Sequence, residues 1–507
     1  MTASTVKNTA IFAIATLLSR VSGLVRDSMF AGYFGTSQQY DAYLVAVMLP
    51  FFLRKIFADG AMTMAFVPIF NDRLNRSREK AFEFASAVMI FVLLLSGAIS
   101  AGGIFFSREL TGIFAGGFSG DTIELTSQLI KISFPFITLV SLWAVYCGIL
   151  NSLDAFFIAA ASPMLINLAT IVGILLSEKF SPPILGPTIG FIAGGAIQLL
   201  VVMLAARRSG FRFNPHYNSQ DARDFLSLFL ISSISPAINE INSFVDTRVS
   251  TELGAGAVSS LGYAQRLYQL PLGIFAIAVA TVALPQLSRL TGKDSKEEFS
   301  KAVWSSITVL AFLLLPSTLG LLVAGEGLVR LLFERGSFTT LDTAVTSGLL
   351  YAYTLGLPFY GAYGVLSRAY YARKSPVTPT IISALMVGVN VVLDIVLGFT
   401  MGPVGVALAT SIAGMLGTII VTATLFAWAG YERKALISIG KIMLASLIMT
   451  AIMLAIRLTI GTGAAATIVA LLVGVIVYFS LVRLLKLGEG INLKRFLKFP
   501  LKRHGKR

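Results

Sequence analysis

The amino-acid sequence predicts an all-α polytopic membrane protein with about fourteen transmembrane helices. We expect two pseudo-symmetric six-helix lobes plus two C-terminal helices. Of the 507 residues, 56% are hydrophobic and only 13% are charged, and the mean hydropathy is +0.81. Soluble domains are about 45–50% apolar and about 25% charged, so one globular core cannot bury this many hydrophobic residues. Apolar runs and proline motifs that recur along the chain supply the rest of the prediction.

Each expected span is an apolar run long enough to cross about 30 Å of hydrocarbon at about 1.5 Å per helical residue. Forty-five glycines and 37 phenylalanines fit such a bundle, because small residues let helices approach and aromatic rings fill the remaining volume. The spans are expected near 8–34, 41–70, 82–106, 124–150, 156–177, 184–206, 223–250, 256–287, 300–324, 343–371, 376–399, 403–428, 437–459 and 463–486.

The positions of basic residues predict the orientation of these spans. Arginines follow the second and sixth spans, at Arg73 and Arg76 and at Arg207 and Arg208, whereas the intervening loops carry almost none. Because the more positive short loops stay in the cytoplasm, both termini are expected there. The net charge of +15 therefore mostly reflects the orientation of the spans in the membrane. It indicates contact with anionic membrane lipids and no nucleic-acid partner.

Proline motifs recur in the same order in the two halves of the chain. Pro50, Pro68, Pro135 and Pro163 are matched by Pro271, Pro285, Pro358 and Pro379. The offsets are about 220 residues, room for about six spans, so the halves should share one orientation. The sequence thus predicts lobes at 1–215 and 216–430, two extra helices within 431–486 and a basic cytoplasmic tail at 487–507.

Ionisable residues interrupt several of these spans. Each costs about 2.5–3.5 kcal/mol near a helix centre, so such residues need a reason. The set comprises Arg20, Arg26, Asp27, Arg54, Lys55, Asp59, Glu240, Asp246, Arg248, Arg266 and Asp394.

In the first half, the charges within the spans are mainly cationic, which predicts a cavity for an anion. Guanidinium groups suit phosphate oxygens because they bind them bidentately. Arg20 and Arg26 lie about 120° apart on an ideal helix, so both reach one cavity only if the helix bends, which Gly23 permits. Arg266 is expected to supply the opposite wall, at the place where Arg54 stands in the first half. The alternative is pairing within a helix, Arg26 with Asp27 or Arg54 with Asp59.

The second half carries oxygen ligands instead. Asn390 and Asp394 are four residues apart, which places both side chains on one helix face. Asp246 and Thr410 could complete an oxygen cage for a small hard cation such as sodium. A proton site on Asp246 or Asp394, or a simple interhelical hydrogen bond from Asn390, is the alternative reading.

Other chemistry has little support in the sequence. No G-x-x-x-x-G-K-[ST] loop is present, so we expect no bound nucleotide. Cys147 is the single cysteine, which rules out an internal disulfide.

Several motifs together resemble the MurJ/MviN family, the bacterial lipid II flippases of the multidrug/oligosaccharidyl-lipid/polysaccharide exporter superfamily. The resemblance runs from residue 5 to beyond residue 430. The motifs are Ser19-Arg-Val-Ser-Gly-Leu-Val-Arg-Asp27, Asp41-Ala-Tyr, Leu49-Pro, Leu53-Arg-Lys-Ile-Phe-Ala-Asp-Gly60, Ala65-Phe-Val-Pro68, Tyr263-Ala-Gln-Arg-Leu-Tyr-Gln-Leu-Pro271 and Leu332-Phe-Glu-Arg-Gly336.

The resemblance implies a V-shaped pair of lobes, with the last two helices forming a groove for a long polyprenyl tail. It implies that the lipid diphosphate binds to Arg20, Arg26, Arg54 and Arg266, and that Asp27 and Asp41 match acidic positions of the pattern. It places a sodium ion on Asp246, Asn390, Asp394 and Thr410, with a backbone carbonyl near Val406. Two departures are Lys55, where arginine is common, and Asp59, where glutamate is common.

The implied function is flipping of lipid II, an undecaprenyl-diphosphate-linked disaccharide peptide, to the outer leaflet of the bacterial inner membrane. Alternating access, coupled to the membrane potential or sodium, is the expected mechanism, with no enzymatic step. The cell-wall synthesis machinery is an expected partner. The alternatives are export of another polyprenyl-diphosphate oligosaccharide, a membrane enzyme acting on polyprenyl phosphates, and a non-transporting scaffold.

Overall fold

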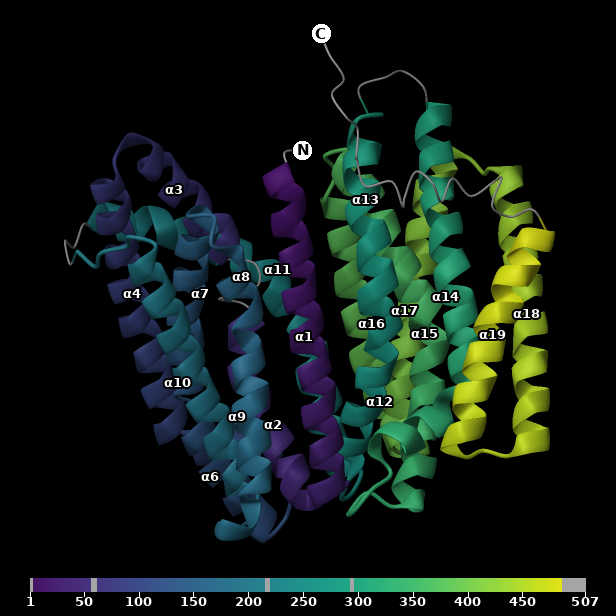
Figure 1. Cartoon of the computed structure of the whole chain (residues 1–507), viewed down its shortest axis with the longest axis horizontal. Coiled ribbons are helices and arrows are strands. Elements are labelled where there is room, and N and C mark those ends of the chain that lie inside the picture. Colours follow the sequence, from purple (N-terminus) through teal and green to yellow (C-terminus); the bar gives the residue numbers. More distant parts are fainter. Residues whose placement is uncertain (1–2, 56–61, 215–218, 292–295, 486–507) are drawn as a thin grey trace. The chain divides into compact units, whose positions relative to one another are not determined.

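The computed structural model describes residues 3–55, 62–214, 219–291 and 296–485. Asp59 and the basic tail at 487–507 lie outside these residues. By its internal contacts the chain divides into two compact units, Met1–Ser259 and Ser260–Arg507. Within the described ranges every regular element is a helix, which confirms the all-α fold class (Figure 1).

The first unit is a bundle of helices. Its elements are α1 (Ala3–Phe34), α2 (Gln38–Arg54), α3 (Met62–Arg76), α4 (Arg78–Phe105), α5 (Ser107–Phe114), α6 (Asp121–Ser133), α7 (Phe136–Ser152), α8 (Phe156–Ala161), α9 (Pro163–Leu175), the 3₁₀ turn η2 (Ser177–Lys179), α10 (Leu185–Arg208) and α11 (Ser219–Glu252).

Helix α12 (Ala257–Pro271) begins at the end of the first unit and continues into the second. The remaining elements are the π-helical turn η3 (Leu272–Ala276), α13 (Ile277–Ser288), α14 (Lys296–Phe333), α15 (Thr340–Ala372), α16 (Val377–Met401), α17 (Pro403–Ala429), α18 (Arg433–Ile460) and α19 (Ala464–Leu484).

Local sequence signals explain where several of these helices begin and end. Thr339 and Asp342 form a capping box that starts α15, which satisfies backbone N–H groups that have no partner inside the helix. Gly402, at φ +68°, separates α16 from α17, because glycine adopts this left-handed backbone without a steric penalty. Pro403 then begins α17, where the missing N–H of proline costs nothing.

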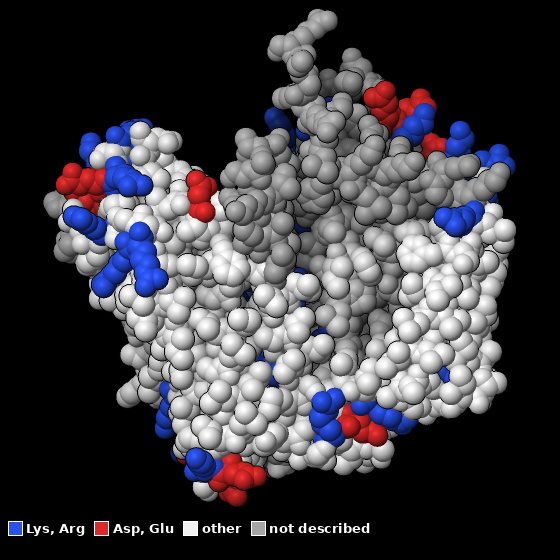
Figure 2. Space-filling view, in the orientation of Figure 1, with Lys and Arg blue, Asp and Glu red and all other residues white. Residues whose placement is uncertain are grey.

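Each of the fourteen expected spans coincides with a described helix or a run of consecutive helices. Ten of these are long and apolar enough to cross a membrane, so the protein is a multi-pass membrane protein. The other four segments are α1, α2 with α3, α11 and α15. Three of these four segments carry charged residues that were singled out in the sequence, which lowers their apolar character. The count of fourteen transmembrane helices therefore stays a prediction. On the face drawn in Figure 2, charged side chains gather toward the helix ends of each unit and leave largely uncharged surface between.

The division between the units differs from the predicted lobe boundary at residues 215 and 216. Helix α11, which we assigned to the second lobe, packs against α2, α3, α4 and α5 and belongs to the first unit. Aromatic contacts hold it there, including those of Phe244 with Phe52 and Phe114. A sequence repeat gives the order of the helices but not the neighbour that each one packs against.

Close contact of two backbones joins α9 to α10 in the first unit. A Cβ atom added to Gly173 would lie 2.3 Å from the backbone oxygen of Gly186, and one added to Gly186 would lie 2.4 Å from the oxygen of Gly173. Further along α10, a Cβ on Gly190 would lie 2.5 Å from the Ala169 oxygen. In an apolar bundle, such small-residue contacts are a main source of helix association.

We expect Gly173→Ala to destabilise the protein by about 1–3 kcal/mol, because its methyl group would force the two backbones apart. The matched control is Gly97→Ala in α4, where an added Cβ meets no atom of the described residues within 4 Å beyond the adjacent backbone of its own helix. Thermal unfolding of the purified full-length protein in detergent measures both. Equal melting temperatures for the two variants would contradict the packing role of Gly173.

Candidate functional site

Arg26 is the centre of a polar cluster inside the first unit. Its Nε and Nη2 donate to Asp27 Oδ1 at 3.0 and 2.7 Å, and its Nη1 donates to Asn167 Oδ1 of α9 at 3.0 Å. The Arg26 side chain is 12% exposed and that of Asp27 is 5% exposed. Arg26 therefore pairs with Asp27, as the alternative of pairing within a helix predicted, and it also reaches a second helix.

Arg20 and Arg54, the other predicted arginines of this unit, have different surroundings. Arg20 is exposed on α1. The Arg54 guanidinium lies 5.9 Å from the ring centre of Phe51 and 5.7 Å from that of Trp143, so aromatic faces support its charge. Its predicted alternative partner, Asp59, lies outside the described residues.

Lys55 forms an ion pair across helices. Its Nζ lies 2.6 Å from Glu240 Oε1 of α11, whose side chain is 14% exposed. Both residues were singled out as charges within spans, but their pairing was not predicted.

Asp41 binds the start of α12. Its Oδ2 accepts the backbone N–H of Gly256 at 2.6 Å, and its Oδ1 accepts that of Ser259 at 2.8 Å. The carboxylate is fully buried, and Val45, one helical turn further along α2, belongs to a small apolar cluster with Ala115 and Val258. Asp41 thus caps a helix N-terminus, where a negative charge is stabilised.

The predicted sodium ligands are divided between the two units. Asp246 lies half-buried on α11 in the first unit, whereas Asn390, Asp394, Val406 and Thr410 lie in the second. The arginine set is divided in the same way, because Arg266 is half-buried on the part of α12 that belongs to the second unit.

Asn390 and Asp394 meet on α16, as their spacing predicted. Asn390 Nδ2 donates to Asp394 Oδ1 at 3.1 Å, and both side chains are fully buried. Asn390 Oδ1 is buried without a hydrogen-bond partner among the described residues. A buried amide oxygen beside a carboxylate is a donor set that fits a small hard cation.

Val406 and Thr410 lie on α17, which packs against α16. Val406 is fully buried, and its carbonyl accepts the Thr410 hydroxyl at 3.3 Å. The Thr410 carbonyl in turn accepts the Tyr360 hydroxyl of α15 at 3.2 Å.

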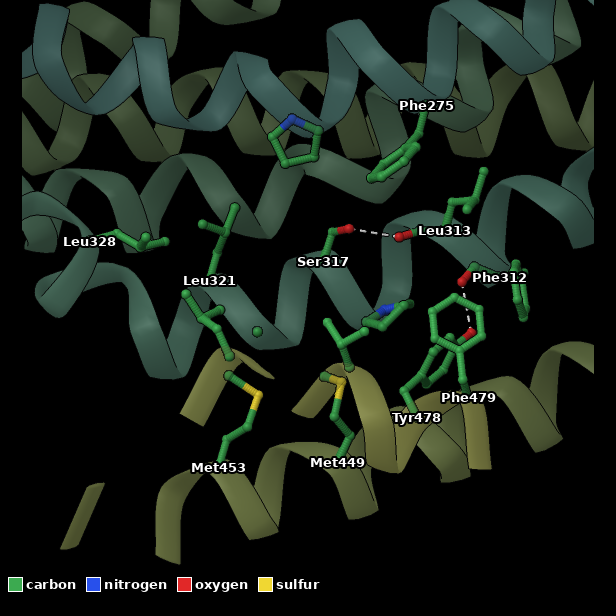
Figure 3. A pocket seen from close by; sticks show the side chains of 15 residues that line it. Phe275, Phe312, Leu313, Ser317, Leu321, Leu328, Met449, Met453, Tyr478 and Phe479 are labelled. Atoms are coloured by element: carbon green, nitrogen blue, oxygen red, sulfur yellow. Dashed lines mark hydrogen bonds between the residues drawn. The ribbon is translucent and has the colours of Figure 1, made fainter. Parts of the chain in front are cut away.

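An apolar cavity of about 310 Å³ lies inside the second unit, where α14, α18 and α19 meet η3 (Figure 3). Two hydroxyl groups in its lining donate hydrogen bonds to backbone carbonyls. Tyr478 donates to Phe312 O at 2.7 Å, and Ser317 donates to Leu313 O at 2.7 Å. The flexible side chains of Met449 and Met453 form another part of the lining. A cavity with this lining accepts an apolar chain.

A charged network joins α18 to α14 in the same unit. Arg457 donates to the Val323 carbonyl and to Glu326 Oε2. Arg330 bridges Glu326 and Glu334 at 3.1 Å each and donates to the Thr462 hydroxyl and carbonyl in the turn between α18 and α19. The C-terminal helix pair is thus held to α14 by charge-assisted hydrogen bonds.

Sequence reasoning missed Asn167, Trp143 and the network around Arg457. Asn167 and Arg457 each interrupt an expected apolar span, which was a usable signal. Trp143 gave none, because an aromatic residue in a membrane span usually has a packing role.

Comparisons with known proteins agree over almost the whole chain. The family model described as "Lipid II flippase MurJ" matches residues 30–482. A "Probable lipid II flippase MurJ" of Thermotoga maritima is 37% identical over 486 residues, 96% of this chain and 98% of the relative. The "Lipid II flippase MurJ" of Thermosipho africanus is 36% identical over 409 residues, 81% of this chain and 83% of the relative.

Two solved structures extend this agreement to the fold. "Lipid II flippase MurJ, inward closed conformation" matches with a TM-score of 0.81 and 35% identity, covering 96% of this chain and 100% of that one. An inward-facing multidrug resistance MATE family transporter of the MOP superfamily matches with a TM-score of 0.69 at 16% identity, over 83% of this chain and 98% of that one. The second likeness concerns the fold alone.

Removal of the Asp41 carboxylate should loosen the start of α12. We expect Asp41→Ala to cost about 1–3 kcal/mol, because two N–H groups lose their buried acceptor. Asp121→Ala, which removes an exposed acid from the first turn of α6, should cost below about 1 kcal/mol. Hydrogen exchange of the peptide that contains Gly256 and Ser259, measured with thermal unfolding, tests this. Unchanged exchange there in Asp41→Ala would rule out the capping role.

Proposed function

The chain belongs to the lipid II flippase MurJ family, and from this premise we propose that it moves lipid II across the bacterial inner membrane, from the cytoplasmic to the outer leaflet. The observation that carries the proposal is the Arg26 guanidinium, held largely buried in a bundle of apolar helices. A cation kept there at high cost has a functional reason. Lipid II supplies the matching anion in its diphosphate.

Arginine chemistry supports binding of the diphosphate. Guanidinium groups bind phosphate oxygens bidentately and stay charged inside an apolar protein. In our proposal Arg20, Arg26 and Arg54 contact the diphosphate, Arg266 contributes a fourth cation, and Asp27 orients Arg26. Asp41 contributes by fixing the start of α12, two turns before Arg266 on the same helix.

The apolar cavity supports binding of the polyprenyl tail. Aromatic and methionine side chains of α14, α18 and α19 line it, and its hydroxyl groups are satisfied internally. We propose that residues 431–486, which include α18 and α19, hold the tail while the headgroup crosses.

The proposed mechanism is alternating access, with both termini in the cytoplasm and no covalent step. The headgroup loses its net charge against the arginines before it crosses the apolar layer, which lowers the cost of transfer. Delivery outside the membrane places the cell-wall synthesis machinery among the proposed partners.

A sodium ion is the proposed cofactor. Asn390 Oδ1, which has no hydrogen-bond partner within the described ranges, lies beside the buried Asp394 carboxylate and supports a cation at this point. Asp246, Thr410 and the Val406 carbonyl are the other proposed ligands. A bound ion would supply a positive charge whose entry and release couple the cycle to the membrane potential, at about 2.3 kcal/mol per charge per 100 mV.

Loss of one arginine should stop transport. In bacteria depleted of their own flippase, we expect the wild-type protein to restore the fraction of lipid II that is accessible from outside. Arg26→Ala and Arg266→Ala should each reduce the restored fraction more than tenfold, because a buried phosphate charge loses its partner at a cost of about 3–5 kcal/mol.

The matched control for this experiment is Arg108→Ala, an exposed arginine on α5, which should transport like the wild type. All variants are compared at equal membrane expression. Wild-type transport by both Arg26→Ala and Arg266→Ala would refute binding of the diphosphate by these arginines. Failure of well-expressed wild-type protein to restore accessibility would refute lipid II as the substrate.

Sodium should stabilise the purified protein against thermal unfolding. At 100 times its dissociation constant, a ligand contributes about 2.7 kcal/mol to the folded state. We expect sodium, compared with choline, to raise the melting temperature of the wild type and of Thr400→Val, a change at an exposed position of α16. Asp394→Ala and Asn390→Ala should abolish the shift. The same sodium shift in all four proteins would exclude a site at Asp394.

A further inference from the structure

Both the nitrogen and the oxygen of the Asn167 side-chain amide form hydrogen bonds with α1. Its Nδ2 donates to the Ser22 hydroxyl at 2.9 Å and to the Ser19 carbonyl at 3.2 Å, while its Oδ1 accepts Arg26 Nη1 at 3.0 Å. The side chain is 8% exposed, and a Cβ on Gly23 would lie 3.6 Å from its Nδ2. One residue of α9 is thus bound to three residues in two turns of α1.

These contacts determine which hydrogens of Arg26 stay available. A guanidinium carries five N–H donors. Asp27 accepts from Nε and Nη2, and Asn167 accepts from Nη1. The hydrogen bonds among the described residues leave one hydrogen on each terminal nitrogen, and two such donors are what a bidentate contact with a phosphate group needs.

An amide suits this position better than a carboxylate. A second acid beside Asp27 would give the cluster a net negative charge and compete with the phosphate for the hydrogens of Arg26. A neutral oxygen fixes the direction of the guanidinium and leaves its charge to be shared between Asp27 and a bound anion. The hydrogen bonds that Nδ2 donates to Ser19 and Ser22 also fix the orientation of the amide. In this orientation, and not in the flipped one, the amide oxygen faces Arg26.

We infer that Asn167 is a positioning residue for substrate binding, which orients Arg26 so that its two remaining N–H groups meet the diphosphate of the lipid. The inference rests on the proposed function and adds a residue that contacts the arginine and not the substrate. It predicts that Asn167 acts only while Arg26 is present.

The test is a double-mutant cycle on the purified full-length protein in detergent, with farnesyl diphosphate as the probe of headgroup binding. Asn167→Ala should weaken binding about tenfold, which corresponds to about 1.4 kcal/mol. In the Arg26→Ala background, the same substitution should change binding less than twofold. The matched control is Thr170→Val on α9, a near-isosteric change of a buried hydroxyl that has no hydrogen-bond partner among the described residues, and it should bind like the wild type. Melting temperatures of all variants establish that each one is folded.

The outcomes separate the inference from the proposed function. Weakening that depends on Arg26 supports the positioning role. Wild-type binding by Asn167→Ala, with weak binding by Arg26→Ala, overturns the role of Asn167 and leaves the proposed function intact. Equal weakening by Asn167→Ala in both backgrounds also overturns it, because the residue then acts through the general structure. Wild-type binding by Arg26→Ala overturns the arginine site and the inference together.

Discussion

The cost of placing a charge among apolar helices is the constraint on which the rest of this structure depends. An ionised side chain in such a place needs a partner of opposite charge or a set of hydrogen bonds. Arg26 has Asp27 and Asn167, Glu240 has Lys55, and Arg457 has Glu326. Each of these contacts except that of Arg26 with Asp27 joins two helices. The pairing of these charges therefore also holds helices together.

The same constraint shapes the apolar cavity of the second unit. Apolar helix surfaces gain no hydrophobic driving force for association in lipid, because lipid tails and leucine side chains are equally apolar. The network of Arg457, Glu326 and Arg330 supplies directional contacts between α18 and α14. Met453, in the cavity lining, lies one helical turn before Arg457 on α18. One end of the cavity wall is thus fixed by charge while its interior stays adaptable.

Sequence patterns were sufficient for those parts of the molecule that depend on neighbours in the chain. Hydropathy located the helices, and spacing four residues apart brought Asn390 to Asp394. The pairing of Arg26 with Asp27 was foreseen as an alternative for the same reason. The partner of Arg26 on α9 could not be foreseen, since it is 141 residues away in the sequence. The packing of α11 on the first unit and the capping role of Asp41 also depend on tertiary contacts, for which hydropathy carries no signal.

Each unit contains a buried carboxylate near an asparagine amide, and the two pairs have different hydrogen-bond partners. In the first unit Arg26 donates to Asp27 and to Asn167 Oδ1, so a cation is built into the chain. In the second, Asn390 donates to Asp394, while Asn390 Oδ1 has no hydrogen-bond partner among the described residues. A built-in cation stays through every cycle and serves to hold an anion. A cation that binds and leaves can instead bias the direction of the cycle. Under the proposed function, the fixed charge at Arg26 helps to bind the diphosphate, and the exchangeable charge near Asp394 resets the transporter.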